Sequence, residues 1–157
     1  MSGTTRFRCL LVVAACALVL PLQAVANNGK PLRGSDRGTF TLGECSPGVL
    51  NVLIGGTGHA SLVGRYDYTA DECFNPTTGT YGGTFIIVAA NGDRLVGTYS
   101  GNVSGTSDPD VAAYHQHMVV SAGTGRFDGV SGELEVEGLA NLATGVYTQS
   151  LDGAVST

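Results

Sequence analysis

Short runs of β-favouring residues, each ended by a turn signal, recur from Gly38 to the end of the chain. This pattern is typical of a β-sandwich or a β-barrel. Asn91-Gly92 stands between two apolar runs and is the strongest of the hairpin signals. We expect strands over residues 38–43, 49–54, 60–69, 80–90, 94–103, 112–122, 133–138 and 145–155. The sequence therefore predicts an all-β domain of about eight strands without a helix.

Glycine decides between the two all-β architectures. The chain has 24 glycines in 157 residues, well above the usual share of roughly 7%. Gly64, Gly97 and Gly138 fall inside expected strands, where glycine marks a bend or a close backbone approach. Such bends let a small sheet curl, and closure removes its exposed edges. We therefore predict a closed antiparallel barrel, with room for its own side chains or one small ligand, and keep a β-sandwich as the alternative.

The first 26 residues have the layout of a cleaved secretory signal. Two arginines precede an unbroken apolar run of 12 residues from Cys9 to Leu20, and Ala24 and Ala26 are the small residues at −3 and −1. The run is shorter than the roughly 20 residues of a membrane span. A lipid-attachment box ending at Cys16 is the alternative, which the apolar residues after it disfavour. We expect a secreted or periplasmic protein, cleaved near Ala26, without a membrane span.

The remaining chain divides into a polar segment and one domain. Residues 27–37 are turn-rich and predict a flexible leader, and residues 38–157 form the barrel domain. After cleavage, six basic residues stand against 13 acidic ones, a net charge of −7. This charge argues against nucleic acid as a partner, because binding phosphates needs a basic patch.

Two cysteines, Cys45 and Cys73, remain once the signal is removed. In an exported chain such a pair indicates a disulfide, which would contribute about 3–4 kcal/mol of stability. A redox or nucleophilic cysteine is the alternative, but the sequence has no CxxC motif and no histidine beside either residue.

Tyrosines supply the first candidate ligand-binding residues. Alternation over 60–69 places Tyr66 with Leu62 on one face, and Arg65 with Val63 on the other. If Tyr66 points inward, its hydroxyl could orient a ligand in an apolar lumen, and Tyr99 invites the same interpretation. The alternative is that both are aromatic core residues. Arg65 is a further ligand-binding candidate.

His115 and His117 form a pair two residues apart and complete the set of ligand-binding candidates. On a strand they would share a face, roughly 7 Å apart, a spacing that suits two imidazoles on one metal. His59 is the only other histidine, and residues 118–125 contain no carboxylate to complete a site. We therefore predict neither a metal nor a cofactor.

The expected strand over 80–90 is apolar on both faces. Phe85, Ile87 and Ala89 alternate with Ile86 and Val88. The outer face should then be covered by a loop or by another subunit, which makes a symmetric homo-oligomer a hypothesis.

Three stretches resemble a known group: GTGHASLVGRYDY (56–68), AANGDRLVGTYSG (89–101) and GTGRFDGVSGELEVEG (123–138). They are similar to small exported bacterial proteins that look like the allene oxide cyclase and dirigent barrels. The resemblance covers residues 40–155 and implies an eight-stranded, calycin-like antiparallel barrel around a central cavity. Plant members of these barrels guide cyclisation or radical coupling of small apolar molecules without a cofactor and tend to be trimers. None of the stretches identifies a catalytic residue.

Three functions follow from these observations. The favoured one is a non-catalytic barrel that binds a small apolar molecule. A cofactor-free cyclase or isomerase and a structural or adhesive envelope protein are the alternatives. An interior cavity with a few convergent polar groups would support binding or catalysis, whereas a fully plugged lumen would support the structural role.

Overall fold

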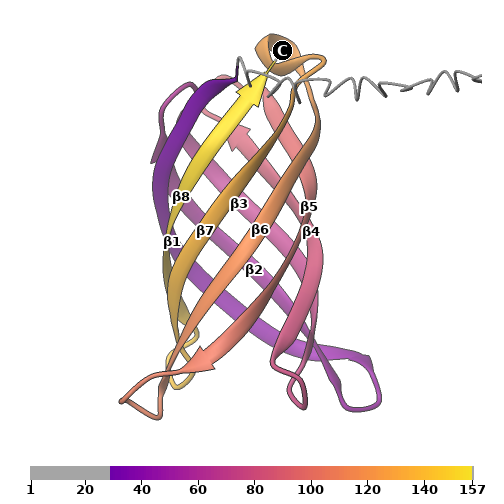
Figure 1. Cartoon of the computed structure of the whole chain (residues 1–157), viewed down its shortest axis with the longest axis vertical. Coiled ribbons are helices and arrows are strands. Elements are labelled where there is room, and N and C mark those ends of the chain that lie inside the picture. Colours follow the sequence, from indigo (N-terminus) through magenta and orange to yellow (C-terminus); the bar gives the residue numbers. More distant parts are fainter. Residues whose placement is uncertain (1–28, 157) are drawn as a thin grey trace, which may run out of the picture.

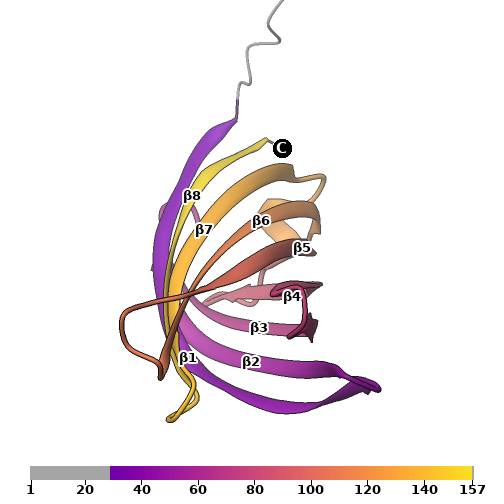
Figure 2. The same cartoon turned by 60° about the horizontal axis from the view of Figure 1, so that its bottom comes forward.

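The computed structural model describes residues 29–156 and arranges them as a closed barrel of antiparallel strands (Figure 1). The strands are β1 (Lys30–Ser46), β2 (Val49–Ala60), β3 (Gly64–Asn75), β4 (Thr80–Ala89), β5 (Arg94–Gly105), β6 (Val111–Gly123), β7 (Ser131–Asn141) and β8 (Val146–Ser156). Each strand pairs with the next, and β8 pairs with β1 to complete the circle, as Figure 2 shows. The predicted eight-stranded barrel is thus confirmed, and a sandwich is excluded because no strand is left as an edge.

The described residues contain no α-helix, and their only helical turn is the short 3-10 segment η1 (Gly125–Phe127). Among them, no helix is long and apolar enough to cross a membrane. The expected signal segment and its cleavage position lie outside the described residues.

β1 begins at Lys30, ahead of the expected start at Gly38. Residues 30–37 are therefore not a flexible leader, because all of them pair with β8 and residues 34–37 also pair with β2. Despite their polar composition, these residues form a strand in which Leu32 and Asp36 point into the barrel, where both are buried. Gly34 lets this strand approach β2 closely, since a methyl group there would lie 2.6 Å from Cβ of Ala60.

The segment 60–69 is two strands joined by a turn, not one. β2 ends at Ala60, and the chain reverses at residues 61–63, with Leu62 at φ 66° and Gly64 at φ 78°. The reversal exposes Leu62 and buries Val63, the opposite of the expected faces. From Gly64 onward the predicted alternation holds, so that Tyr66 is buried and Arg65 is exposed.

One end of the barrel is plugged. At this end, where β1 begins and β8 ends, the loop between β6 and β7 folds over the opening and buries Phe127 and Val130 (Figure 1, top). The guanidinium of Arg126 lies 4.7 Å from the centre of the Phe127 ring and donates a hydrogen bond of 2.7 Å to the carbonyl of Val63. Arg126 therefore connects the η1 loop, which forms the plug, to the β2–β3 turn.

Inside the barrel, aromatic rings lie against glycines of neighbouring strands. A methyl group added to Gly58 would come within 2.6 Å of the Tyr66 ring, and one added to Gly101 within 2.6 Å of the Tyr81 ring. Gly138 lies against Tyr114 in the same way. These inward tyrosines lie where the adjacent strand has no side chain, which explains part of the high glycine content.

The inner face of β4 consists of Phe85, Ile87 and Ala89, which are buried. On the outer face, Ile86 keeps 39% of its surface exposed, so no loop within residues 29–156 covers it. The homo-oligomer remains a prediction.

Candidate functional site: a cavity in the open half of the barrel

A cavity of about 300 Å³ occupies the half of the barrel opposite the plug. Apolar side chains form most of its wall, among them Phe40, Val52, Ile54, Phe74 and Val103. Leu42 and Leu142 stand at its rim with 60% and 58% of their surfaces exposed, so the cavity opens between the turns at this end. The lumen is therefore plugged in one half and hollow in the other.

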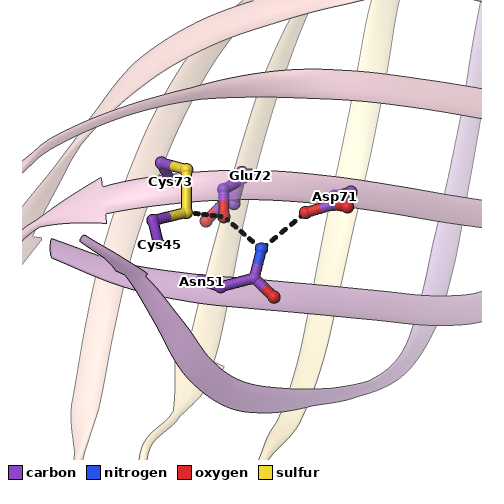
Figure 3. The surroundings of a disulfide bond; sticks show 5 residues. All are labelled: Cys45, Asn51, Asp71, Glu72 and Cys73. Atoms are coloured by element: carbon purple, nitrogen blue, oxygen red, sulfur yellow. Dashed lines mark hydrogen bonds between the residues drawn. A yellow bond between two sulfur atoms is a disulfide. The ribbon is translucent and has the colours of Figure 1, made fainter.

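A disulfide holds the wall of the cavity near this opening. Cys45, at the end of β1, is bonded to Cys73 on β3, with a Cα–Cα distance of 6.0 Å, which confirms the predicted pair (Figure 3). Beside it, the Nδ2 of Asn51 on β2 donates a hydrogen bond of 2.6 Å to Asp71. The covalent link fixes β3 at the residue next to Glu72, which faces inward. A disulfide also suggests an oxidising, extracytoplasmic location.

A buried carboxyl group lies deeper in the barrel. Oδ2 of Asp36 accepts hydrogen bonds from the hydroxyl of Tyr66 at 2.9 Å and from Nε2 of Gln149 at 3.0 Å. Burial raises the pKa of Asp36 above its usual value, and the hydrogen bonds from Gln149 and Tyr66 offset only part of this effect. The Tyr114 hydroxyl donates to Oε1 of Gln149 at 3.0 Å, so both ends of this amide are engaged.

A second carboxyl group, that of Glu72, lines the cavity itself. Its Oε2 accepts a hydrogen bond of 2.8 Å from the Tyr99 hydroxyl. Burial raises the pKa of Glu72 to about 7, against the lowering effect of the Tyr99 hydrogen bond. Both protonation states of Glu72 are therefore populated near neutral pH.

The third polar group is an amide with a free donor. Gln116 is only 4% exposed, and its Oε1 accepts a hydrogen bond of 3.2 Å from the hydroxyl of Tyr81. Within residues 29–156, its Nε2 has no hydrogen-bond partner, and neither has the hydroxyl of Tyr147. Both residues line the cavity. A buried donor left unpaired costs about 1–3 kcal/mol, but both atoms are almost completely covered by the protein, so neither is open to the cavity.

The structure places two of the five candidate ligand-binding residues inside the barrel, although neither lines the cavity. Tyr66 and Tyr99 point into the barrel and are buried. Arg65, His115 and His117 lie on the outer surface. Their role in binding remains a prediction, and the barrel wall separates them from the two tyrosines.

The histidine pair faces acidic side chains of β7. Nε2 of His115 is 3.1 Å from Oε2 of Glu135, and Nδ1 of His117 is 2.7 Å from Oε1 of the same carboxylate. Nowhere in the described part of the chain do three histidine, cysteine, aspartate or glutamate side chains form a group that could hold a metal ion.

Sequence reasoning missed the three polar groups with the most consequence: Asp36, Glu72 and Gln116. Asp36 lies in the segment interpreted as a leader, and Glu72 lies beyond the expected end of its strand. Continuing the inward alternation from Tyr66 through Tyr68 would have reached Glu72. The inward position of Gln116 follows from the outward histidines on either side of it.

The fold and cavity define an eight-stranded closed β-barrel with one plugged and one open end. Comparison with protein-family models, with curated proteins and with solved structures found no match to this chain.

Proposed function

We propose that the protein is an extracytoplasmic binding protein that holds a small, largely apolar molecule in its lumen. The observation that carries this proposal is the cavity of about 300 Å³, whose wall is mostly apolar and includes Glu72. Its volume lies at the lower end of the range of ligand pockets, so the molecule is small. The exposed leucines at the rim extend the apolar surface to the entrance.

A matched pair of variants tests this function. Ala112 lines the cavity, whereas the next residue, Ala113, does not. The wild type should bind the neutral fluorescent probe N-phenyl-1-naphthylamine with a stoichiometry of one. Ala112→Phe fills the lumen and should abolish binding, and Ala113→Phe should leave it unchanged. Circular dichroism checks that each variant is folded. Absence of binding by the wild type, or equal binding by both variants, contradicts the proposal.

A cofactor-free isomerase or cyclase is a second candidate, which the Glu72–Tyr99 pair favours. A general acid or base works best when its pKa is near the operating pH, and the pKa of Glu72 is raised to about 7 in an apolar cavity. The eight-stranded barrel supports this candidate through the resemblance to the allene oxide cyclase and dirigent barrels, which itself stays a proposal.

Small molecules that co-purify with the protein separate the two candidates. They would be identified by mass spectrometry and incubated with fresh protein. An isomerase converts such a molecule to a product of equal mass and different retention time, and Glu72→Gln should stop the conversion while binding persists. An unchanged ligand in the presence of wild-type protein supports binding alone.

A further inference from the structure

We propose that the molecule held in the lumen is an organic cation, a protonated amine with an apolar remainder, whose ammonium group binds the carboxylate of Glu72. This inference rests on the proposed function, because it names the class of molecule that the same cavity takes.

Glu72 offers this cavity a carboxylate oxygen that the protein leaves unused. Among the described residues it is the only acidic side chain that lines the cavity, and no lysine, arginine or histidine lines it. Its Oε2 accepts the hydrogen bond from the Tyr99 hydroxyl, whereas its Oε1 accepts none from residues 29–156 and is not sealed off by the protein. Asp36 does not compete for a ligand, because its Oδ1 is completely covered.

A carboxylate in an apolar wall favours a cationic partner. Burial removes water from the ionised group, and an ionised carboxylate only accepts hydrogen bonds. The pKa of Glu72 is raised to about 7 by this burial, since no basic side chain supplies a counter-charge in the cavity. An ammonium group would supply both the positive charge and the N–H donors, in a hydrogen bond stronger than one between neutral groups.

The opening of the cavity carries charge of the matching sign. The strand ends and turns around it comprise residues 42–53, 71–82, 101–113 and 139–148. These segments contain no lysine, arginine or histidine, and besides Glu72 they carry Glu44, Asp71, Asp108 and Asp110. The carbonyl of Asp110 accepts a hydrogen bond of 2.7 Å from the backbone N–H of Leu142, so the acidic loop lies beside the rim.

The basic side chains of the described chain lie away from the opening. Arg37 is exposed on the outer surface of β1. The others belong to the plugged end, at the start of β1, β3 and β5 and in η1: Lys30, Arg33, Arg65, Arg94 and Arg126. A cation that approaches the opening therefore meets only carboxylates, which attract it, whereas an anion is repelled there.

Three eight-carbon probes that differ only in their head group test the inference. At pH 8 Glu72 is largely ionised, and octylamine is protonated because its amine resembles that of lysine. We expect octylamine to bind the wild type about tenfold more tightly than 1-octanol, the effect of a hydrogen bond between charged groups. Octanoate should bind most weakly. Tighter binding of octanoate than of octylamine would overturn the inference.

A matched pair of variants assigns the preference to Glu72. Glu72→Gln removes the charge at similar volume and should make the affinities for octylamine and 1-octanol equal. Glu133→Gln makes the same change at an exposed side chain near the start of β7, so the amine preference should persist. If Glu133→Gln also loses the preference, net charge rather than Glu72 holds the amine, and the inference is wrong.

Proton release from the wild type covers the case in which Glu72→Gln does not fold. Near pH 7 about half of the Glu72 side chains carry a proton, which must leave for solvent when an ammonium group binds the carboxylate. Calorimetry in two buffers of different ionisation enthalpy should therefore show release of about half a proton per octylamine at pH 7. Binding of 1-octanol should release none. Octylamine binding without proton release would overturn the inference.

The other titratable groups that face the lumen do not supply this proton. Burial raises the pKa of each inward phenol above its usual value, so these groups stay protonated: Tyr68, Tyr81, Tyr99, Tyr114 and Tyr147. Asp36 on β1 is the remaining carboxyl group, and proton release should persist in Asp36→Asn. Loss of the release in that variant would assign the proton to Asp36 and contradict the inference.

The same titrations separate this inference from the proposed function. Equal affinities of the wild type for octylamine and 1-octanol refute the inference alone. Binding of neither probe refutes the proposed function as well.

Discussion

Substitutions at Gly56 and at its neighbour Gly55 test whether the barrel needs glycine where a strand lies in close contact with both the adjacent strand and a tyrosine side chain. A methyl group at Gly56 would collide with the Tyr147 hydroxyl and would lie 2.6 Å from the backbone carbonyl oxygen of Arg37. Arg37 belongs to β1, which is paired on both sides, so its backbone has little freedom to move away. At Gly55 a methyl group would meet nothing within 4 Å.

The two substitutions should differ by several kilocalories per mole. Overpacking an interior costs typically 1–3 kcal/mol, and the contact of Gly56 with rigid backbone places Gly56→Ala at the upper end, about 2–3 kcal/mol. Gly55→Ala loses no contact and reduces the entropy of the unfolded chain, so we expect a change between zero and a stabilisation of about 1 kcal/mol.

Urea unfolding followed by circular dichroism and tyrosine fluorescence measures both variants, since the protein has no tryptophan. The double variant Gly56→Ala/Tyr147→Phe should recover part of the loss, because it removes the hydroxyl but leaves the Arg37 carbonyl in place. Equal stability of the two single variants would refute the reasoning.

Three further predictions concern charge, covalent link and plug. Wild-type stability should fall, by on the order of 2 kcal/mol, as pH rises from 4.5 to about 7, because the folded state holds the Glu72 proton more tightly than the unfolded state. Thermal unfolding over a pH series should show a shallower fall for Glu72→Gln, with only the part due to Asp36 remaining. Cys45→Ser/Cys73→Ser should lose about 3 kcal/mol in urea unfolding, and dithiothreitol should destabilise the wild type but not this variant. Phe127→Ala should lose about 3 kcal/mol by calorimetry, and an unchanged Tm would contradict the role of the plug.

Much of the architecture is readable from the sequence because barrel strands alternate and turns favour glycine. Alternation correctly separated Tyr66 from Arg65, and the Asn91-Gly92 signal marked a real turn between β4 and β5. The turn at Leu62 was missed because leucine carries no signal for a positive φ, so the chain seemed to continue as a strand.

The candidate site was harder to predict than the fold. Alternation assigns residues to two faces, but only closure makes one face a lumen, and only the register brings Asp36 of β1 opposite Gln149 of β8. The Gln116 amide accepts a hydrogen bond from Tyr81, which lies two strands away. Contacts of this kind depend on long-range pairing and leave no local pattern in the sequence.

Lys30 pairs with Val155, so both ends of the described barrel lie beside the plug. The opening of the cavity, beside Leu42 and Leu142, is at the opposite end of the barrel. Attachment to a bead, a sensor chip or a carrier protein near either Lys30 or Ser156 would therefore leave the opening of the cavity unobstructed, because it faces away from the support.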